Sequence, residues 1–560
     1  MRAADTAVLV AYFVTMVVVG LVYSRRMKSL DKYFAGDKQL SWWLGGVSFV
    51  MAYVSALSIV VYAALGYQYG LVALTIYWTT VPGTLITTWL LARRWRRAGI
   101  ITPVEFLETR FSSAVRQIFV WSGIPLKVID DSLKIVAIGI FVSAGMKISA
   151  DGAMLAVGLI ALIYTVMGGL WAVAVTDFVQ FVLVMAGILL MVPLSLHAAG
   201  GWSHFVAVAP QGFLKPVHEP YTRSYIGAFL VLSAMSLAGN WSLIQKFYSA
   251  RSDHECRGVG WLASLLFLIM PPLWIFTGMF ARAFVSPQGI DPQRIYAHVS
   301  ASLMPPGMLG LVVAALFAAT MSVLSSGYNV SAAVLTVDVH QRLIHPKATQ
   351  RELVVMGRIL TSLVALIALA IALIINHFHW TIFNAMVAAF GFFLPPTVLP
   401  VVAGLLTPRL SASGAIAAFV TGIAAGFVMM AYKLIAKPEN LASYQAASII
   451  IPTVATSIAL LLGAYVFPVK GEARERSSRF FTQLNRAALP SATAENPASV
   501  AGVVIFIMGL VLMIVGGGFI ADRANTLTFG TGFVLGLVGV AMMKPMWFEP
   551  MLRWLQKAPK

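Results

Sequence analysis

The chain has 560 residues, of which 59% are hydrophobic and 11% are charged, and it carries a formal net charge of +18. Soluble globular domains carry about 25% charged residues, so this composition excludes that class and indicates a protein that lies within a membrane. The positive charge is confined to segments between apolar runs, and no stretch combines basic and aromatic residues as a nucleic-acid groove would. We therefore expect an all-α fold, because helices satisfy their own backbone groups in lipid.

About fifteen apolar segments are long enough to span a bilayer. They lie near residues 5–24, 43–68, 71–93, 116–147, 151–171, 174–198, 226–247, 258–285, 307–338, 355–376, 380–405, 413–434, 446–468, 498–520 and 527–546. A very tight turn, marked by Gly168 and Gly169, separates the fifth segment from the sixth. The sequence thus predicts a polytopic membrane protein with about 15 transmembrane helices.

Clusters of Lys and Arg recur between the apolar segments, at residues 25–28, 93–97, 246–257, 342–358, 470–486 and 553–560. Loops rich in these residues stay on the cytoplasmic side of a membrane. With fifteen helices and the N-terminus outside, every cluster falls on that side. We therefore expect a multi-pass protein of the plasma membrane, the bacterial inner membrane in particular, with a cytoplasmic C-terminus. The stretch 469–497 is expected to be a charged cytoplasmic linker.

Four ionisable residues lie together in the fourth predicted helix, in the segment KVIDDSLK at 127–134. Lys127 and Asp131 are four residues apart, as are Asp130 and Lys134, so two pairs can neutralise each other on one helix. Each charge at bilayer depth costs roughly 2.5–3.5 kcal/mol on insertion scales, so the group needs a reason to be there. Two interpretations stay open: an ion-pair patch that faces the bundle interior, or a polar wall of a substrate or ion cavity.

Asp177, at the predicted start of the sixth helix, has no Lys or Arg within a turn on either side. A carboxylate in that position needs a distant basic partner, a proton or a cation. Carboxylate, hydroxyl and carbonyl oxygens together suit a hard cation such as Na⁺. The alternative is a helix N-cap, in which the carboxylate is stabilised by the positive end of the helix dipole.

The ninth predicted helix carries a face of small and oxygen-bearing residues within 314–329. Spacings of three and four residues place on this face Ala315, Ala318, Ala319, Ser322, Ser325, Ser326 and Asn329. Such a face serves either for close packing on a neighbouring helix or for offering oxygens to a desolvated ion. Both uses remain open from the sequence.

The sequence lacks the motifs of several enzyme classes. It contains no P-loop, no Ser-His-Asp set that can be placed and no Cys-His metal spacing. ATP-driven transport and hydrolase chemistry therefore have no support. We expect neither enzymatic activity nor an organic cofactor.

Three stretches resemble the sodium:solute symporter family, which includes the sodium–glucose, proline, pantothenate and sialic acid transporters. The strongest is YTVMGGLWAVAVTDFVQ at 164–180, which is similar to the family signature Y-T-x-x-G-G-L-x-A-V-x-x-T-D-x-x-Q. GNWSLIQK at 239–246 resembles the broken sixth core helix of the family, and 322–329, followed by Asp338, resembles its eighth core helix. The resemblance covers roughly residues 5–470.

The resemblance implies a leucine-transporter-like fold with an inverted repeat of five plus five helices, in which the first helix of each repeat is interrupted at mid-membrane. The implied organisation is an extra helix and cytoplasmic loop at 1–42, a first repeat at 43–198, an extracellular loop at 199–225, a second repeat at 226–405, accessory helices at 406–468, the linker at 469–497, and C-terminal helices with a short tail at 498–560.

The resemblance also implies two sodium sites. The main site would take the backbone carbonyls of Met51, Val54 and Ala319 and the hydroxyl of Ser322. Val323 stands where the family often has a second Ser. A second site, found in some members, would use Asp177, Ser325 and Ser326. Na⁺ is the expected coupling ion.

The substrate residues implied by position are Tyr53, Ser58, Tyr77, Asp131, Asn240, Trp241 and Phe390. The glutamate and lysine that hold a sugar in the sugar transporters are missing, whereas Asn240 is kept. The two carboxylates at 130–131 lie where sialic acid transporters place an arginine, which disfavours an anionic solute. We expect a small neutral or cationic polar compound, whether sugar-like, amino-acid-like or other.

The leading expectation is Na⁺-coupled uptake by alternating access, with Na⁺ bridging the first and eighth core helices. One alternative is H⁺ coupling, with Asp177 or Asp131 as the proton carrier, since desolvation favours the neutral form of a carboxyl group. Another is a membrane solute sensor that does not transport. The roughly fourteen residues after the last predicted helix leave no room for an output domain.

Overall fold

A computed structural model describes residues 2–24, 40–100, 105–146, 148–167, 170–378, 381–486, 498–517, 528–540 and 542. The tight turn predicted at Gly168 and Gly169 lies outside these residues. The basic clusters at 25–28 and 553–560 and the last part of the predicted linker at 469–497 also lie outside them.

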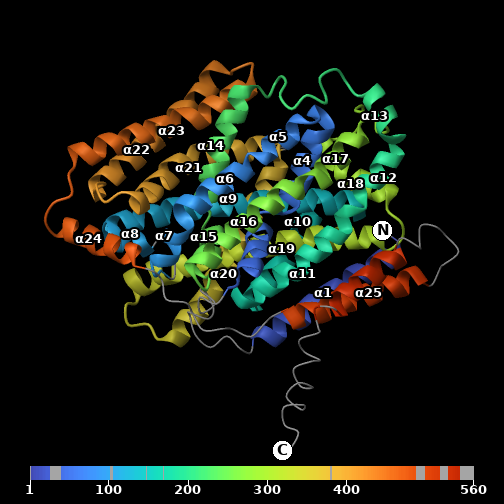
Figure 1. The fold of residues 1–560 in the computed structure, drawn as a ribbon, viewed down its shortest axis with the longest axis horizontal. Helices are drawn as coiled ribbons and strands as arrows, with labels where there is room; N and C mark the ends of the chain where they lie inside the picture. Colours follow the sequence, from blue (N-terminus) through green and yellow to red (C-terminus); the bar gives the residue numbers. More distant parts are fainter. Residues whose placement is uncertain are drawn as a thin grey trace, which may run out of the picture.

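The described chain is almost entirely helical, which confirms the predicted all-α character of the fold (Figure 1). Its first half contains α1 (Ala3–Ser24), α3 (Trp42–Met51), α4 (Ala56–Tyr69), α5 (Val72–Trp78), α6 (Thr80–Thr87), η2 (Thr88–Ala92), α7 (Arg93–Arg97), α8 (Glu105–Arg110), α9 (Ser113–Met146), α10 (Ala150–Met167), α11 (Leu170–Leu189), α12 (Met191–Ala198) and α13 (Gly201–Val208). Its second half contains α14 (Arg223–Gly239), α15 (Trp241–Tyr248), α16 (Asp253–Ile269), α17 (Pro271–Ala281), η3 (Pro292–Arg294), α18 (Ile295–Leu303), α19 (Met308–Val334), η4 (Leu335–Ile344), α20 (Gln350–His377), α21 (Ile382–Leu406), α22 (Ala412–Ala436), α23 (Leu441–Val466), α24 (Gly471–Asn485), α25 (Ala498–Gly517) and a last helix at Thr528–Val540.

Within the described residues, each predicted apolar segment falls on helical structure. By length and composition, 7 of the described helices can cross a membrane, or up to 9 if each of two bent pairs forms one span. Several predicted segments consist of two or more shorter helices, such as α16 and α17, which meet at Pro271. The total of fifteen therefore stays a prediction.

Two helices are interrupted at the positions where the inverted repeat predicts a break. The axes of α3 and α4 differ by 61°, and those of α14 and α15 by 54°. Asn240 explains the second break, because its side-chain oxygen accepts hydrogen bonds from the amides of Ser242 (3.0 Å) and Leu243 (3.4 Å) and so caps α15. At the first break the Ala56 amide donates to the Thr320 hydroxyl at 3.1 Å, so a contact with α19 replaces an intrahelical bond.

Helix α19 lies at the centre of the molecule, and every one of its residues is buried. It packs against α1, α9, α11 and α20. Its N-terminal end is fixed to α1 by Asp5, whose carboxylate accepts hydrogen bonds from the amides of Gly307 (2.8 Å) and Gly310 (3.1 Å). The small residues of the 314–329 face let neighbouring helices approach closely, and their hydroxyls remain inside the core.

Several of the basic segments gather at one end of the molecule, where α7, α8 and α24 lie together on the left of Figure 1. Arg97 on α7 forms an ion pair with Asp253 at 2.6 Å and donates to the Leu484 carbonyl on α24 at 3.1 Å. Glu108 on α8 pairs with Arg116 (2.9 Å) and with Arg342. Segments far apart in the sequence therefore share one charged end of the bundle, and the cytoplasmic location of that end stays a prediction.

The segment 469–497, predicted to be a charged linker, contains a helix in its described part. Its first part folds into α24, an amphipathic helix whose buried residues are Ser477, Phe480 and Leu484. Arg476 donates to the Phe111 carbonyl at 2.6 Å, which ties α24 to the start of α9. The buried positions 477, 480 and 484 have helical spacing, which the high charge of the segment concealed.

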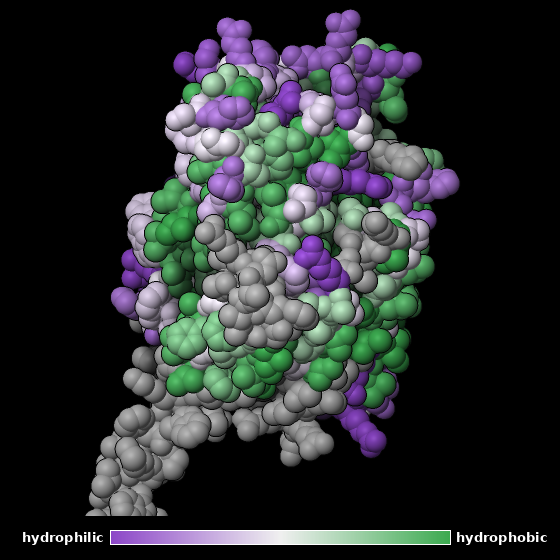
Figure 2. All heavy atoms as spheres, turned by 90° about the vertical axis from the view of Figure 1, so that its right-hand side faces the viewer, coloured by the Kyte–Doolittle hydropathy of each residue, from purple (hydrophilic) through white to green (hydrophobic). Residues whose placement is uncertain are grey.

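Much of the described surface is apolar. Figure 2, which views the right-hand side of Figure 1, shows broad hydrophobic areas below a hydrophilic top. On α22 and α23 the exposed apolar residues include Phe427, Val428, Leu461 and Leu462. A surface of this kind is stable in contact with lipid and not in contact with water.

Candidate functional site

Asp177 lies inside α11, about two turns after the helix begins at Leu170. The N-cap interpretation of this residue is therefore wrong, because an N-cap precedes the first turn. The sequence suggested a later start because it places Thr176 directly before Asp177 and the next long apolar run after them. The Asp177 side chain is fully buried, so its charge requires partners within the protein.

Three side chains from three other helices supply those partners. Ser48 on α3 and Ser322 on α19 each donate a short hydrogen bond to one carboxylate oxygen of Asp177. Lys246 on α15 places its ammonium nitrogen 3.8 Å from Asp177 Oδ2. We call these four residues the Asp177 centre. Of the three possibilities that the sequence left for Asp177, the structure shows the distant basic partner.

The Asp177 centre adjoins the break between α3 and α4. The Ser322 hydroxyl lies 3.4 Å from the carbonyl oxygen of Met51, the last residue of α3. Val54, in the break itself, is buried, as is Ala319 one turn before Ser322 on α19. The structure thus places Met51 and Ser322 together as expected, and it adds Asp177 to them. Val323 is buried beside Ser322 and offers no hydroxyl.

Ser325 and Ser326 differ from the expected second site. Ser325 donates to the Ser322 carbonyl at 3.0 Å, and Ser326 has a buried hydroxyl without a hydrogen-bond partner in the described part of the chain. The hydroxyls that bond to Asp177 come from Ser48 and Ser322. Asp177, which was expected in the second site, is therefore hydrogen-bonded to Ser322, which was expected in the main site.

The four charges on α9 form the cluster that their spacing predicted. Lys127 contacts Asp130 at 3.0 Å and Asp131 at 2.9 Å, and Lys134 contacts the same two carboxylates at 2.6 and 3.4 Å. All four residues are buried. Asp131 is fully buried, and its Oδ2 atom lies close to Gly327 of α19, where a Cβ would come within 2.5 Å of it.

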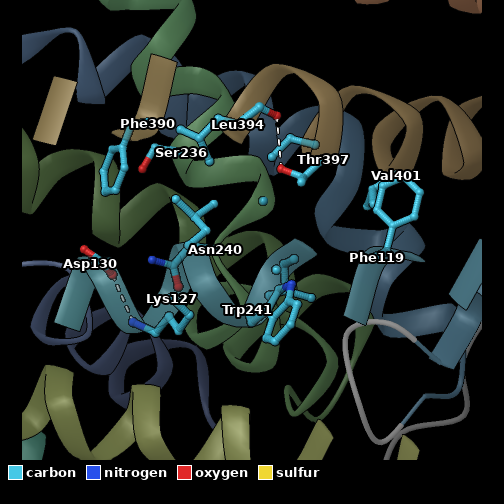
Figure 3. Close-up of a pocket in the computed structure, with 15 residues that line it drawn as sticks. Phe119, Lys127, Asp130, Ser236, Asn240, Trp241, Phe390, Leu394, Thr397 and Val401 are labelled. Carbon is cyan, nitrogen blue, oxygen red and sulfur yellow. Dashed lines mark hydrogen bonds and ion pairs between the residues drawn. The ribbon is translucent and has the colours of Figure 1, made fainter. Parts of the chain in front are cut away.

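Two cavities adjoin this cluster. The first is bordered by Lys127, Asp130, Asn240 and Trp241, together with apolar residues of α9, α15 and α21 (Figure 3). The second is bordered by hydroxyl-bearing and aromatic residues that include Tyr53, Ser58, Tyr77, Thr80, Ser233 and Phe229. A few polar groups that converge in a mostly apolar pocket are typical of small-molecule sites.

Both cavities share four lining residues, namely Asp130, Ser236, Asn240 and Phe390. Of the predicted substrate residues, Tyr53, Ser58, Tyr77, Asn240, Trp241 and Phe390 line one cavity or both. Asp131 lines neither, because it turns toward α19, and its neighbour Asp130 faces the cavities instead. The α9 cluster agrees in part with each of the two interpretations that the sequence left open. Its ion pairs neutralise each other, and one side of the cluster forms a cavity wall.

The sequence profile of the sodium:solute symporter family matches residues 33–422, which is well over half of the chain. The chain belongs to this family. The sodium/glucose cotransporter of Vibrio parahaemolyticus is 26% identical over 455 residues, which cover 75% of this chain and 83% of that protein. Human sodium/glucose cotransporter 4 is 27% identical over 484 residues, with coverage of 77% and 69%.

The fold of this family member is also found among solved structures. A Na⁺-coupled sialic acid symporter in a substrate-bound, outward-open state superposes with a TM-score of 0.71 at 21% identity, covering 84% of this chain and 99% of that one. A transporter of the nucleobase-cation-symport-1 family superposes with a TM-score of 0.52 at 15% identity, covering 79% and 97%. Together with the apolar helices, the family membership shows a multi-pass membrane transport protein.

Two features of this symporter-family chain were missed from the sequence. Lys246 was grouped with the cytoplasmic basic loop at 246–257, whereas it is buried and faces Asp177. Ser48 carried no signal, because a lone Ser in an apolar helix usually bonds to its own backbone. A clue to Lys246 existed in its neighbours, because Leu243 and Ile244 precede it and Phe247 and Tyr248 follow it in the short helix that Asn240 caps.

Proposed function

We propose that the chain takes up a small polar organic solute by Na⁺-coupled symport through alternating access. The observation that carries the proposal is the buried Asp177 carboxylate, which lies beside Ser322 and the Met51 carbonyl at an interrupted helix. Carboxylate, hydroxyl and carbonyl oxygens are the ligands of hard cations, and unwound backbone in transporters supplies such carbonyls. The names of the sodium/glucose cotransporter relatives agree with this proposal.

In the proposed sodium site, Na⁺ is bound by oxygens of Met51, Val54, Ala319, Ser322 and Asp177. Ser325 and Ser326 lie one turn further along α19 and provide a second position, or a path between the site and the cytoplasm. Na⁺ in this position bridges α3, α11 and α19. Its binding would thereby favour one arrangement of the interrupted helix over the other, which is the requirement for coupling.

The proposed solute site lies at the junction of the two cavities, around Asn240, Ser236, Asp130 and Phe390. Asp130 already accepts from two lysines, so the wall carries little net charge. A solute with several hydroxyl or amide groups, neutral or carrying a positive charge, matches this lining better than an anion does. Trp241 adds an aromatic ring to the lining of the first cavity, and Tyr53 adds one to the lining of the second.

The proposal includes the inverted repeat. The first repeat would comprise α3 to α12, within 43–198, and the second α14 to α21, within 226–405. The loop at 199–225 and the cluster of α7, α8 and α24 would then lie on opposite sides of the membrane, outside and cytoplasmic respectively. With α1, α22, α23, α25 and the last helix added, this arrangement gives about fifteen helical segments.

The proposal is tested in two steps with the purified full chain. A thermal-shift screen of small solutes, each with NaCl and with choline chloride, identifies a ligand, because a bound ligand stabilises the folded state by mass action. Counterflow of that ligand in proteoliposomes is then measured with and without Na⁺. We expect counterflow to depend on Na⁺. Equal counterflow without Na⁺ would contradict Na⁺ coupling, and uptake driven by a pH gradient alone would indicate H⁺ coupling.

A further inference from the structure

Lys246 has an unusual environment for a lysine. Its side chain is 1% exposed, and its ammonium nitrogen has no hydrogen-bond partner in the described part of the chain. The nearest counter-charge is Asp177 Oδ2 at 3.8 Å, beyond the range of a hydrogen bond. Both oxygens of that carboxylate are already used by the hydroxyls of Ser48 and Ser322.

The charge balance of the Asp177 centre follows from these contacts. The centre contains one carboxylate and one ammonium group, both fully or almost fully buried, so it is neutral without any ion. A Na⁺ ion at the carboxylate would leave two positive charges beside one negative charge in a region of low dielectric constant. Two like charges in such a region repel each other strongly.

We infer that Lys246 is a tethered cation that competes with Na⁺ for Asp177. Without Na⁺ the ammonium keeps the centre neutral, and when Na⁺ binds the ammonium must move away from the carboxylate. Lys246 therefore lowers the affinity of the site for Na⁺ and assists its release. This inference deepens the proposed function and rests on it, since it takes Asp177 as a Na⁺ ligand.

The position of Lys246 also links the ion to the solute. Lys246 lies on α15, the eight-residue helix whose N-cap is Asn240. Asn240 borders both cavities, while Lys246 near the other end of the helix faces Asp177. A displacement of α15 on solute binding would move the ammonium relative to the carboxylate. Since coupling free energies are reciprocal, Na⁺ binding would then favour solute binding to the same extent.

The experiment is equilibrium binding of ²²Na⁺ to the purified full chain, measured by scintillation proximity for the wild type and four variants. Lys246→Met removes the tethered charge and should lower the Kd for Na⁺ by tenfold or more. Lys246→Arg keeps the charge and should bind Na⁺ about as weakly as the wild type. Lys246→Gln repeats the test with a polar side chain should the Met variant fold poorly. Lys433→Met is the matched control, because it removes one lysine charge on α22, where the ammonium lies over the Tyr444 ring.

The outcomes separate this inference from the proposed function. Unchanged or weaker Na⁺ binding by both Lys246→Met and Lys246→Gln, with a wild type that binds Na⁺, would overturn the inference alone. An equal gain in Lys433→Met would also overturn it, because the effect would then reflect overall charge. Absence of Na⁺ binding in the wild type and in every variant would overturn the proposed function itself.

Discussion

The α9 cluster and the Asp177 centre are two buried groups that contain lysine and aspartate, and they differ in how many helices supply their residues. In the α9 cluster all four charges lie within one helix, and the contacts join residues three or four positions apart. In the Asp177 centre the carboxylate and the ammonium come from α11 and α15, and the hydroxyls come from α3 and α19. A cluster of the first kind is neutral in any arrangement of the bundle, whereas the second depends on how four helices are placed. The second is therefore the group that a conformational change can open to an ion.

The largest effect is expected from Asp177→Asn. It leaves the Lys246 ammonium buried without a counter-charge, and breaking a buried pair in this way costs about 3–5 kcal/mol. The melting temperature of the purified protein should fall strongly. The double variant Asp177→Asn with Lys246→Met should recover most of the loss. If the melting temperature of the double variant stays as low as that of Asp177→Asn, the ion pair is not what stabilises this region.

A smaller loss is expected from Asp131→Asn in the α9 cluster. Lys127 and Lys134 keep Asp130 as a partner, so the loss of free energy of unfolding should lie below about 3 kcal/mol. Replacing the pair together, as Lys127→Met with Asp131→Leu, should restore stability and leave ²²Na⁺ binding as in the wild type. A loss of ²²Na⁺ binding in that double variant would show that the two groups act as one site.

Asn240→Ala tests the junction between the cavities. The cap of α15 is lost, which costs about 1 kcal/mol of stability, and the cavity loses a polar group. We expect the Kd for the solute identified by thermal shift to rise about tenfold, with a smaller change for Na⁺. Asn240→Asp, which keeps the capping oxygen, is the matched control for stability. If Asn240→Ala weakens Na⁺ binding and solute binding equally, the change results from the lost cap of α15 and not from the lost polar group in the cavity.

The smallest effect concerns Glu108, a partly exposed group at the charged end of the bundle. Partial burial raises the pKa of Glu108, but hydrogen bonds from Arg342 and Arg116 outweigh it, so the pKa lies below its ordinary value. A carboxyl group with a lowered pKa adds stability above its unfolded pKa of about 4.3, and this is lost as the pH falls through the folded value. As the pH falls from above about 4.3 through the lowered folded pKa, the wild type should lose up to about 1 kcal/mol more than Glu108→Gln. If the free energy of unfolding of the wild type and of Glu108→Gln changes with pH in the same way, Glu108 does not contribute to stability as proposed.

The contrast between the two groups also explains what the sequence could predict. The α9 pairs follow from helical spacing alone, so their contacts were predictable, although the choice of Asp130 over Asp131 as the cavity residue was not. That choice depends on Gly327, which lets α19 approach the Asp131 carboxylate closely. For Asp177 the sequence left a distant basic partner as one of several possibilities and did not identify that partner.

The parts that were missed depend on tertiary contacts. Lys246 opens the segment 246–257, which also contains Arg251 and Arg257, so charge patterning placed it at the cytoplasmic surface. Its burial results from the bend at Asn240, which directs α15 into the core beside α3 and α19. The α24 helix was likewise hidden by its charge, because only three of its residues are buried.

The most direct test of the Asp177 centre as a sodium site is the melting temperature of the purified chain in NaCl, KCl and choline chloride at equal concentrations. We predict a higher melting temperature in NaCl than in the other two salts for the wild type, because bound Na⁺ stabilises the folded state. The double variant Asp177→Asn with Lys246→Met, which has no unpaired buried charge, should lose this difference. Equal melting temperatures of the wild type in all three salts, or an unchanged difference in the double variant, would contradict the account.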